Sequence, residues 1–142
     1  MHKKSHKSQV SRAGLAIVAI ITSALAWADD ISDANDVICY GWSAAVCDAE
    51  EGCEVTEAWR LDLPDFVRLD LRDGIATTTE AGPEQRETEF ESVERADGVI
   101  VLQGMQDDRA FSWMIVESSG EGTLTMSSPG QGVTVFTVCT PD

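Results

Sequence analysis

Histidine and lysine are both absent from residues 29–142, the last 114 residues of this 142-residue chain. Without histidine, this region has no general base for a Ser-His-Asp triad and no partner for a catalytic cysteine. Without lysine it cannot form a Ser-Lys dyad. Zinc sites of the usual kind need His or closely spaced Cys pairs, and neither is present. We therefore expect no catalytic residue, no metal site and no cofactor in this region, apart from whatever its carboxylates can do.

Positive charge is scarce in the same region. All 25 acidic residues of the chain lie in residues 29–142, against six arginines, which leaves a net charge of −19. Nucleic acids and anionic lipid surfaces bind basic patches, so both are excluded as partners. The charge is explained most simply by solubility, but it would also steer the protein towards a cationic protein partner.

Long hydrophobic runs are missing except for Ala13–Ala28, which has about 16 residues where a membrane-spanning helix needs about 20. This run follows a basic segment and ends on the small-residue pattern Ala26-Trp27-Ala28. Such an arrangement is typical of a secretory signal peptide. We predict that residues 1–28 are removed, with Ala24-x-Ala26 as the alternative cleavage site. The product would be secreted or periplasmic, with no membrane span.

Four cysteines remain after residue 28: Cys39, Cys47, Cys53 and Cys139. An even number of cysteines in an exported domain predicts disulfides, and four cysteines allow three connectivities. We favour a local Cys47–Cys53 bridge and a Cys39–Cys139 bridge that joins the two ends of the domain. The second choice is Cys39–Cys47 with Cys53–Cys139. In either pairing Cys139 lies close to the N-terminal segment.

After Cys53 the sequence favours β-structure. Apolar and polar residues alternate in Val67–Arg72 and Phe111–Ile115, and Val99–Leu102 is typical of a buried central strand. Turn signals such as Asp97-Gly98 recur every 8–12 residues. Residues 84–96 are compatible with a helix, but their alternation favours a strand.

These patterns predict a single all-β domain over residues 37–142, preceded by a flexible acidic N-terminus at residues 29–36. The expected fold is a small antiparallel β-barrel or sandwich of seven to nine short strands, in a meander. We prefer the barrel, because a Cys39–Cys139 bridge would seal its seam. Residues 37–52 look irregular and are expected to form a disulfide-held N-terminal loop.

The aromatic residues are expected to pack mainly in the core, although inward-facing aromatics of a small barrel could line a cavity. They are Tyr40, Trp42, Trp59, Phe66, Phe90, Phe111, Trp113 and Phe136. The acidic segments at residues 48–54 and 107–108 lack the spacing of an EF-hand and are interpreted as solvated loops rather than irregular calcium sites.

The leading hypothesis is a non-enzymatic binding protein for a cationic protein or a small apolar ligand. The alternatives are a carboxylate-based hydrolase acting on envelope glycans or a purely structural envelope component. The sequence does not identify ligand-binding residues.

Overall fold

The computed structural model describes residues 29–61, 63–79 and 85–142, so the predicted signal peptide lies outside the described residues. Within these ranges the chain forms ten strands and one short 3-10 helix, η1 (Ala58–Leu61). The strands are β1 (Asp36–Asp48), β2 (Gly52–Thr56), β3 (Phe66–Asp70), β4 (Ile75–Thr78), β5 (Glu87–Glu89), β6 (Ser92–Ala96), β7 (Val99–Gln106), β8 (Arg109–Val116), β9 (Glu121–Ser128) and β10 (Gln131–Pro141). All strand pairs are antiparallel, which confirms the predicted all-β, antiparallel class.

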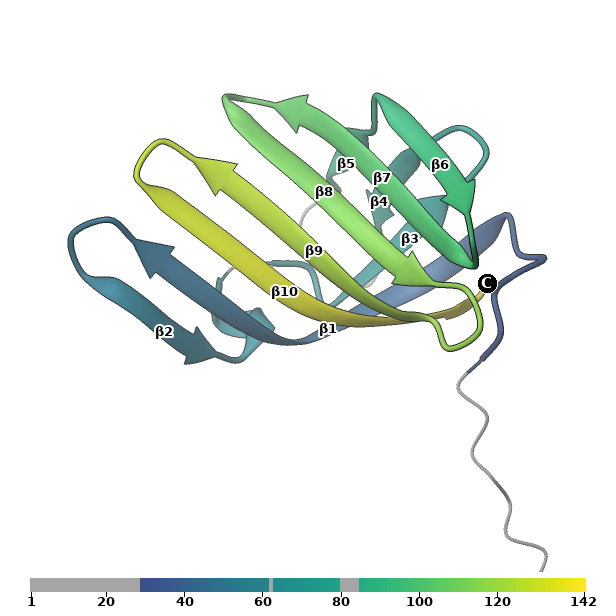
Figure 1. Cartoon of the computed structure of the whole chain (residues 1–142), viewed down its shortest axis with the longest axis horizontal. Helices are drawn as coiled ribbons and strands as arrows, with labels where there is room; N and C mark the ends of the chain where they lie inside the picture. Colours follow the sequence, from purple (N-terminus) through teal and green to yellow (C-terminus); the bar gives the residue numbers. More distant parts are fainter. Residues whose placement is uncertain (1–28, 62, 80–84) are drawn as a thin grey trace, which may run out of the picture.

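The strands form one continuous sheet that curls into a half-barrel (Figure 1). Its order is β5-β4-β3-β1-β10-β9-β8-β7-β6, and β2 pairs with the free part of β1. Strands β6 to β10 are a simple meander, as predicted, and β1 joins this meander to the β3–β5 meander. The described residues contain one strand more than the seven to nine expected.

The prediction of a disulfide-held loop at residues 37–52 is wrong, because most of this segment is β1. This strand has 13 residues and lies between β10 and β3. Its apolar alternation is hidden by a β-bulge between Gly41 and Ser43, where Trp42 and Ser43 together face Phe136. A bulge shifts the period of two by one residue. The sequence pattern therefore looks irregular although the backbone stays extended.

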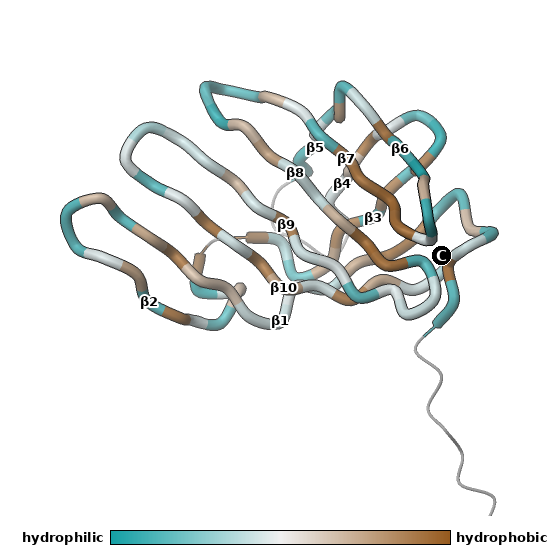
Figure 2. Tube along the Cα trace, viewed as in Figure 1, coloured by the Kyte–Doolittle hydropathy of each residue, from teal (hydrophilic) through white to brown (hydrophobic). Residues whose placement is uncertain are grey.

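Each strand of the curled sheet runs between two ends with different packing. At one end, which we call the packed end, fully buried side chains from both halves of the sheet meet, among them Leu69, Ile100 and Ile115. Figure 2 shows the most hydrophobic stretches of β7 and β8 there, whereas the hairpin tips at the other end are hydrophilic. We call this other end, around the Gln106–Arg109 hairpin, the open end.

The packed end is covered by the segment that precedes β1. Ile31 is fully buried, and its amide N–H donates to the carbonyl of Glu117 at 2.8 Å. Arg95 donates to the carbonyls of Ser32 and Ala34 and forms an ion pair with Glu117. The predicted flexibility of residues 29–36 stays a prediction, but Ile31 is part of the core.

Both disulfides of the favoured connectivity are present. Cys39–Cys139 joins β1 to β10, and Cys47–Cys53 joins β1 to β2. Each bridge connects two directly paired residues of neighbouring strands, with Cα atoms 4.0 Å apart. Two structural disulfides indicate an oxidising, extracellular-type compartment. In the described part of the chain, no helix is long and apolar enough to cross a membrane.

Candidate functional site

The concave side of the sheet holds a cavity of about 660 Å³, next to the packed end. Residues from β1, β3, β4, β5, β7, β8, β9 and β10 line it, together with η1 and the residues that follow η1. The apolar ones include Val67, Ala76, Phe90, Phe111, Trp113, Leu124, Met126 and Val135. The cavity is therefore the part of the barrel interior that the protein's own side chains leave unfilled.

Strand alternation places the lining residues of β8. Side chains two residues apart in a strand share one face of the sheet. Arg109, Phe111 and Trp113 therefore project into the concave side, in line with the buried Ile115. Along this line the environment changes from solvent at Arg109 to a dry core at Ile115.

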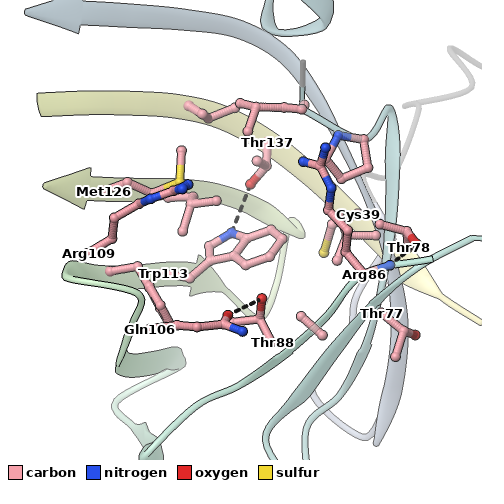
Figure 3. Close-up of a pocket in the computed structure, with 18 of the residues that line it drawn as sticks. Cys39, Thr77, Thr78, Arg86, Thr88, Gln106, Arg109, Trp113, Met126 and Thr137 are labelled. Atoms are coloured by element: carbon pink, nitrogen blue, oxygen red, sulfur yellow. Dashed lines mark hydrogen bonds between the residues drawn. The ribbon is translucent and has the colours of Figure 1, made fainter. Parts of the chain in front are cut away.

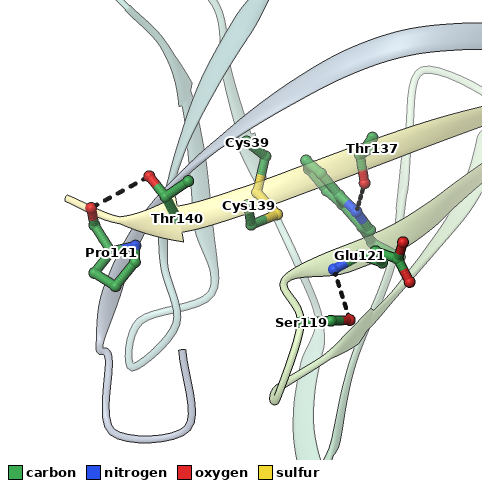
Figure 4. The surroundings of a disulfide bond; sticks show 8 residues. Cys39, Ser119, Glu121, Thr137, Cys139, Thr140 and Pro141 are labelled. Carbon is green, nitrogen blue, oxygen red and sulfur yellow. Dashed lines mark hydrogen bonds between the residues drawn. A yellow bond between two sulfur atoms is a disulfide. The ribbon is translucent and has the colours of Figure 1, made fainter. Parts of the chain in front are cut away.

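A hydrogen bond across the sheet holds Trp113 in the cavity wall. Its indole N–H donates to the Thr137 hydroxyl of β10 at 3.1 Å, across the intervening strand β9 (Figure 3). This is possible because Gly122 of β9 lies between them: a Cβ there would be 2.7 Å from the Thr137 hydroxyl oxygen. Figure 4 shows the bond beside the Cys39–Cys139 disulfide.

The wall presents few unsatisfied polar groups to a ligand. Among the described residues, every buried side-chain nitrogen and oxygen has a hydrogen-bond partner. Trp113 and Thr137 satisfy each other, and the Thr78 hydroxyl accepts a bond from the Arg86 amide at 2.9 Å. An occupant of the cavity body therefore gains mainly from apolar contact.

The two edge strands of the half-barrel approach each other beside the cavity. They are consecutive in the chain, since only Phe90 and Glu91 separate β5 from β6. Phe90 packs edge-to-face on Phe111 of β8, with ring centroids 5.3 Å apart. The Thr88 hydroxyl of β5 donates to the Gln106 side chain at 3.0 Å. These contacts hold the curl and enclose the cavity on its β5 side.

On the β1 side, η1 covers the cavity. Ala58 of η1 is buried against Ala44 and Val135, with Leu61 and Leu63 packed around them. Gly41 of β1 lies in the same contact region, where a Cβ would lie 3.1 Å from the Val135 side chain, closer than ordinary packing. The 3-10 helix replaces the strand that the alternation of Trp59, Leu61 and Leu63 suggests.

Four charged side chains line the cavity at the open end: Arg86, Glu87, Asp107 and Arg109. All four are exposed. In the view of Figure 3, Arg86 and Arg109 lie on opposite sides of Trp113. The site thus combines an apolar interior with a charged mouth.

Comparison with known proteins found no family model, no curated protein and no solved structure that matches this chain. The site is therefore interpreted from its own geometry. Its volume lies within the range of about 300–1,000 Å³ that is typical of small-molecule pockets, and its lining combines apolar side chains with polar and charged ones.

The aromatic residues divide between the two faces of the sheet. Phe90, Phe111 and Trp113 line the cavity. The expectation that the aromatics are mainly core is wrong for the other five, which are 39–58% exposed: Tyr40, Trp42, Trp59, Phe66 and Phe136. Tyr40 and Trp42 lie in β1, Phe66 and Phe136 lie in the neighbouring strands β3 and β10, and Trp59 lies in η1. The bulge in β1 makes it difficult to predict from the sequence which face of the sheet each residue of β1 takes.

The predicted disulfide cysteines contribute unequally to the site. Cys39 lines the cavity, whereas Cys47 and Cys53 lie in the β1–β2 hairpin. Sequence reasoning missed Arg109, Met126 and Thr137 as lining residues. The alternation of Phe111, Trp113 and Ile115 carried the signal for Arg109, because extending it by two residues places Arg109 on the same face.

The acidic segments form turns. The Asp48 carboxylate accepts bonds from the amides of Glu50 at 2.8 Å and Glu51 at 3.3 Å, which caps the β1–β2 turn. Asp107 and Asp108 have φ angles of 50° and 61° and form the two-residue turn between β7 and β8. In the ranges that the structure describes, no three potential metal ligands converge.

Proposed function

We propose that this protein is an exported, non-enzymatic binding protein that holds a small apolar ligand inside its curled sheet. In this proposal the sheet works as a small open barrel, and residues 1–28 direct the chain to a secreted or periplasmic location. The observation that carries the proposal is the cavity of about 660 Å³ with its apolar lining. A void of this size in a domain of this length is otherwise a loss of packing contacts.

The arrangement of buried polar groups supports an apolar ligand. Trp113 and Thr137 hydrogen-bond to each other rather than offering free groups to the interior. The ligand body therefore needs no polar groups to match the wall, and its removal from water supplies the binding free energy.

Hydrolysis is less well supported by the same site. Glu87 and Asp107 are the carboxylates that line the cavity, and both are exposed. A glycosidase acid generally gains its function from burial in an apolar environment, and neither side chain has one. The geometry therefore favours binding over the glycan hydrolase hypothesis.

The proposal is tested with Nile red, a neutral apolar dye whose emission rises in apolar surroundings. The oxidised protein is expected to bind it and increase its emission. Met126→Trp, which fills the cavity from β9, should weaken binding about tenfold or more, because a bulkier side chain occupies the ligand's volume. Val67→Phe fills it from the opposite wall and guards against misfolding of the first variant.

Met114→Trp is the matched control. Met114 lies on the outer face of β8, is 48% exposed, and does not line the cavity. Its substitution should leave dye affinity unchanged. Equal affinities for wild type, Met126→Trp and Val67→Phe, with all three folded by circular dichroism, would refute the proposed site.

The outer face of the sheet favours a second candidate function, binding of a cationic protein. Tyr40 contacts Phe66 with ring centroids 5.3 Å apart, and Trp42 contacts Phe136 at 5.8 Å. We call these four exposed residues the aromatic patch. The patch belongs to a region with a net charge of −19, which attracts a basic surface and repels a second copy of the chain.

This candidate predicts salt-sensitive binding to a basic protein such as a lysozyme. Affinity should be highest at low salt, and Trp42→Ser or Phe136→Ser should lower it. Val55→Ser is the control, since Val55 is 79% exposed on β2 outside the aromatic patch. Absence of binding at low salt would remove this candidate and would leave the cavity proposal intact.

A further inference from the structure

The arginines of the described residues differ in whether a carboxylate neutralises them. Arg60, Arg68, Arg72 and Arg95 each form an ion pair, with Glu57, Asp142, Asp36 and Asp70, and Glu117 respectively. Arg109 takes part in none of the ion pairs found between described residues. In a region with 25 acids and six arginines, an arginine that lacks such a partner is unexpected on charge grounds alone.

Arg109 lies at the mouth of the cavity. It is the first residue of β8, it lines the cavity, and alternation puts it on the same face as Phe111 and Trp113. A ligand lying along β8 would contact these two aromatic side chains with its body and would reach Arg109 with its end. The guanidinium has five N–H donors in a planar fork that matches a carboxylate.

We propose that the ligand is an amphiphile with a single carboxylate, whose apolar body fills the cavity and whose head group binds Arg109. This inference rests on the proposed function, because it assigns the head group of the molecule that the cavity holds. The carboxylate head group would neutralise Arg109 as acidic side chains neutralise Arg60, Arg68, Arg72 and Arg95.

The mouth carries two acids and two arginines, since Glu87 and Asp107 line the same cavity as Arg86 and Arg109. Their formal charges balance, so the preference for an anionic head group rests on Arg109, which forms no ion pair with another described residue. A long-chain carboxylic acid is the simplest molecule that meets these conditions.

The test compares dodecanoate with dodecanol, which share a chain and differ in the head group, by displacement of Nile red at about pH 8. Wild type should bind dodecanoate about fivefold more tightly than dodecanol, the size expected for one exposed ion pair. Arg109→Gln should abolish this preference, because dodecanoate loses its ion pair. Arg72→Gln, which removes an exposed arginine outside the cavity, should keep it.

The outcomes separate the inference from the proposed function. If neither ligand displaces the dye, both fail. If both ligands bind with equal affinity, or if Arg109→Gln retains the preference for dodecanoate, the cavity stands and the role of Arg109 is refuted. Tighter binding of dodecyl phosphate than of dodecanoate would overturn the assignment of a singly charged carboxylate head.

Discussion

The two ends of β8 are built from the same alternating pattern and yet serve different purposes. At the packed end Ile115 is fully buried, whereas at the open end Arg109 is exposed at the mouth of the cavity. What separates them is the covering. The segment before β1 inserts Ile31 over the packed end, while the described residues of the open end include the short turn at Asp107 and Asp108.

This contrast shows how a small domain can keep a large void. The larger of the two hydrophobic clusters includes the packed end, where buried side chains of β3, β7 and β8 meet. The disulfides join β1 to β10 and to β2. The core and the cavity adjoin at Phe90 and Trp113, which belong to this cluster and also line the cavity.

The largest expected effect distinguishes the two disulfides. Removing the Cys39–Cys139 bridge with a double Cys→Ala variant releases a constraint across 100 residues, which the chain-entropy model values at about 4.7 kcal/mol. The Cys47–Cys53 bridge closes a loop with a sequence separation of only six. Its removal should lower the free energy of unfolding by about 2 kcal/mol. Urea unfolding of both double variants measures the difference. Equal losses of unfolding free energy would show that the Cys39–Cys139 bridge stabilises the fold no more than the Cys47–Cys53 bridge.

The next prediction compares two leucines. Leu102 is fully buried in the packed end, whereas Leu124 is half-buried and lines the cavity. Leu102→Ala should lower the free energy of unfolding by about 3–5 kcal/mol, since it creates a new cavity in a dense core. Leu124→Ala only enlarges an existing one and should lower it by about half as much.

Urea unfolding measures the stability of both leucine variants, and Nile red fluorescence measures their dye binding. Leu124→Ala is expected to alter dye binding, whereas Leu102→Ala is expected to leave it intact at low urea. A larger loss of stability from Leu124→Ala than from Leu102→Ala would contradict the division into a packed and an open end.

Much of the fold was predictable because its signals are local. Asp97-Gly98 forms the expected two-residue turn, with φ angles of 53° and 78°, and both favoured disulfides are present. Residues 87–89 and 92–96 form two strands, where the alternation in residues 84–96 predicted one. The turn and the strands follow from neighbouring residues, whereas the Cys39–Cys139 bridge joins residues 100 apart and was favoured from the positions of the four cysteines.

The rest depended on contacts between distant segments. The bulge at Gly41 hides β1 by shifting its alternation, and only pairing with β10 reveals it. The cavity could not be located because its wall needs residues from eight strands, with Gly122 making room for the bond between Trp113 and Thr137. That Arg109 forms no ion pair with another described residue is likewise a property of the folded chain, because a sequence with 25 acidic residues gives no sign of it.

The smallest expected effect concerns the turn between β3 and β4, which lies at the packed end. The Asp70 carboxylate accepts bonds from the amides of Asp73 and Arg72, which hold its pKa below the usual 3.8. In the same turn the Leu71 amide donates to Asn35, next to the covering segment. Because the folded pKa is lowered, the stabilisation is complete above about pH 3.8 and is lost as the pH falls through the folded value.

Comparison of wild type with Asp70→Asn isolates this contribution, because asparagine keeps an oxygen acceptor but does not titrate. The stability advantage of wild type should shrink between about pH 6 and pH 2.5, and carboxyl chemical shifts should report the lowered pKa of Asp70 directly. Asp30, whose pKa is lowered first by the Ser32 hydroxyl and then by the Ser32 amide, offers a second such group in the covering segment. Because both groups lie at the packed end, acidification should loosen the covering segment through them. An advantage of wild type over Asp70→Asn that stays constant down to about pH 2.5 would show that this turn does not make the packed end sensitive to acid.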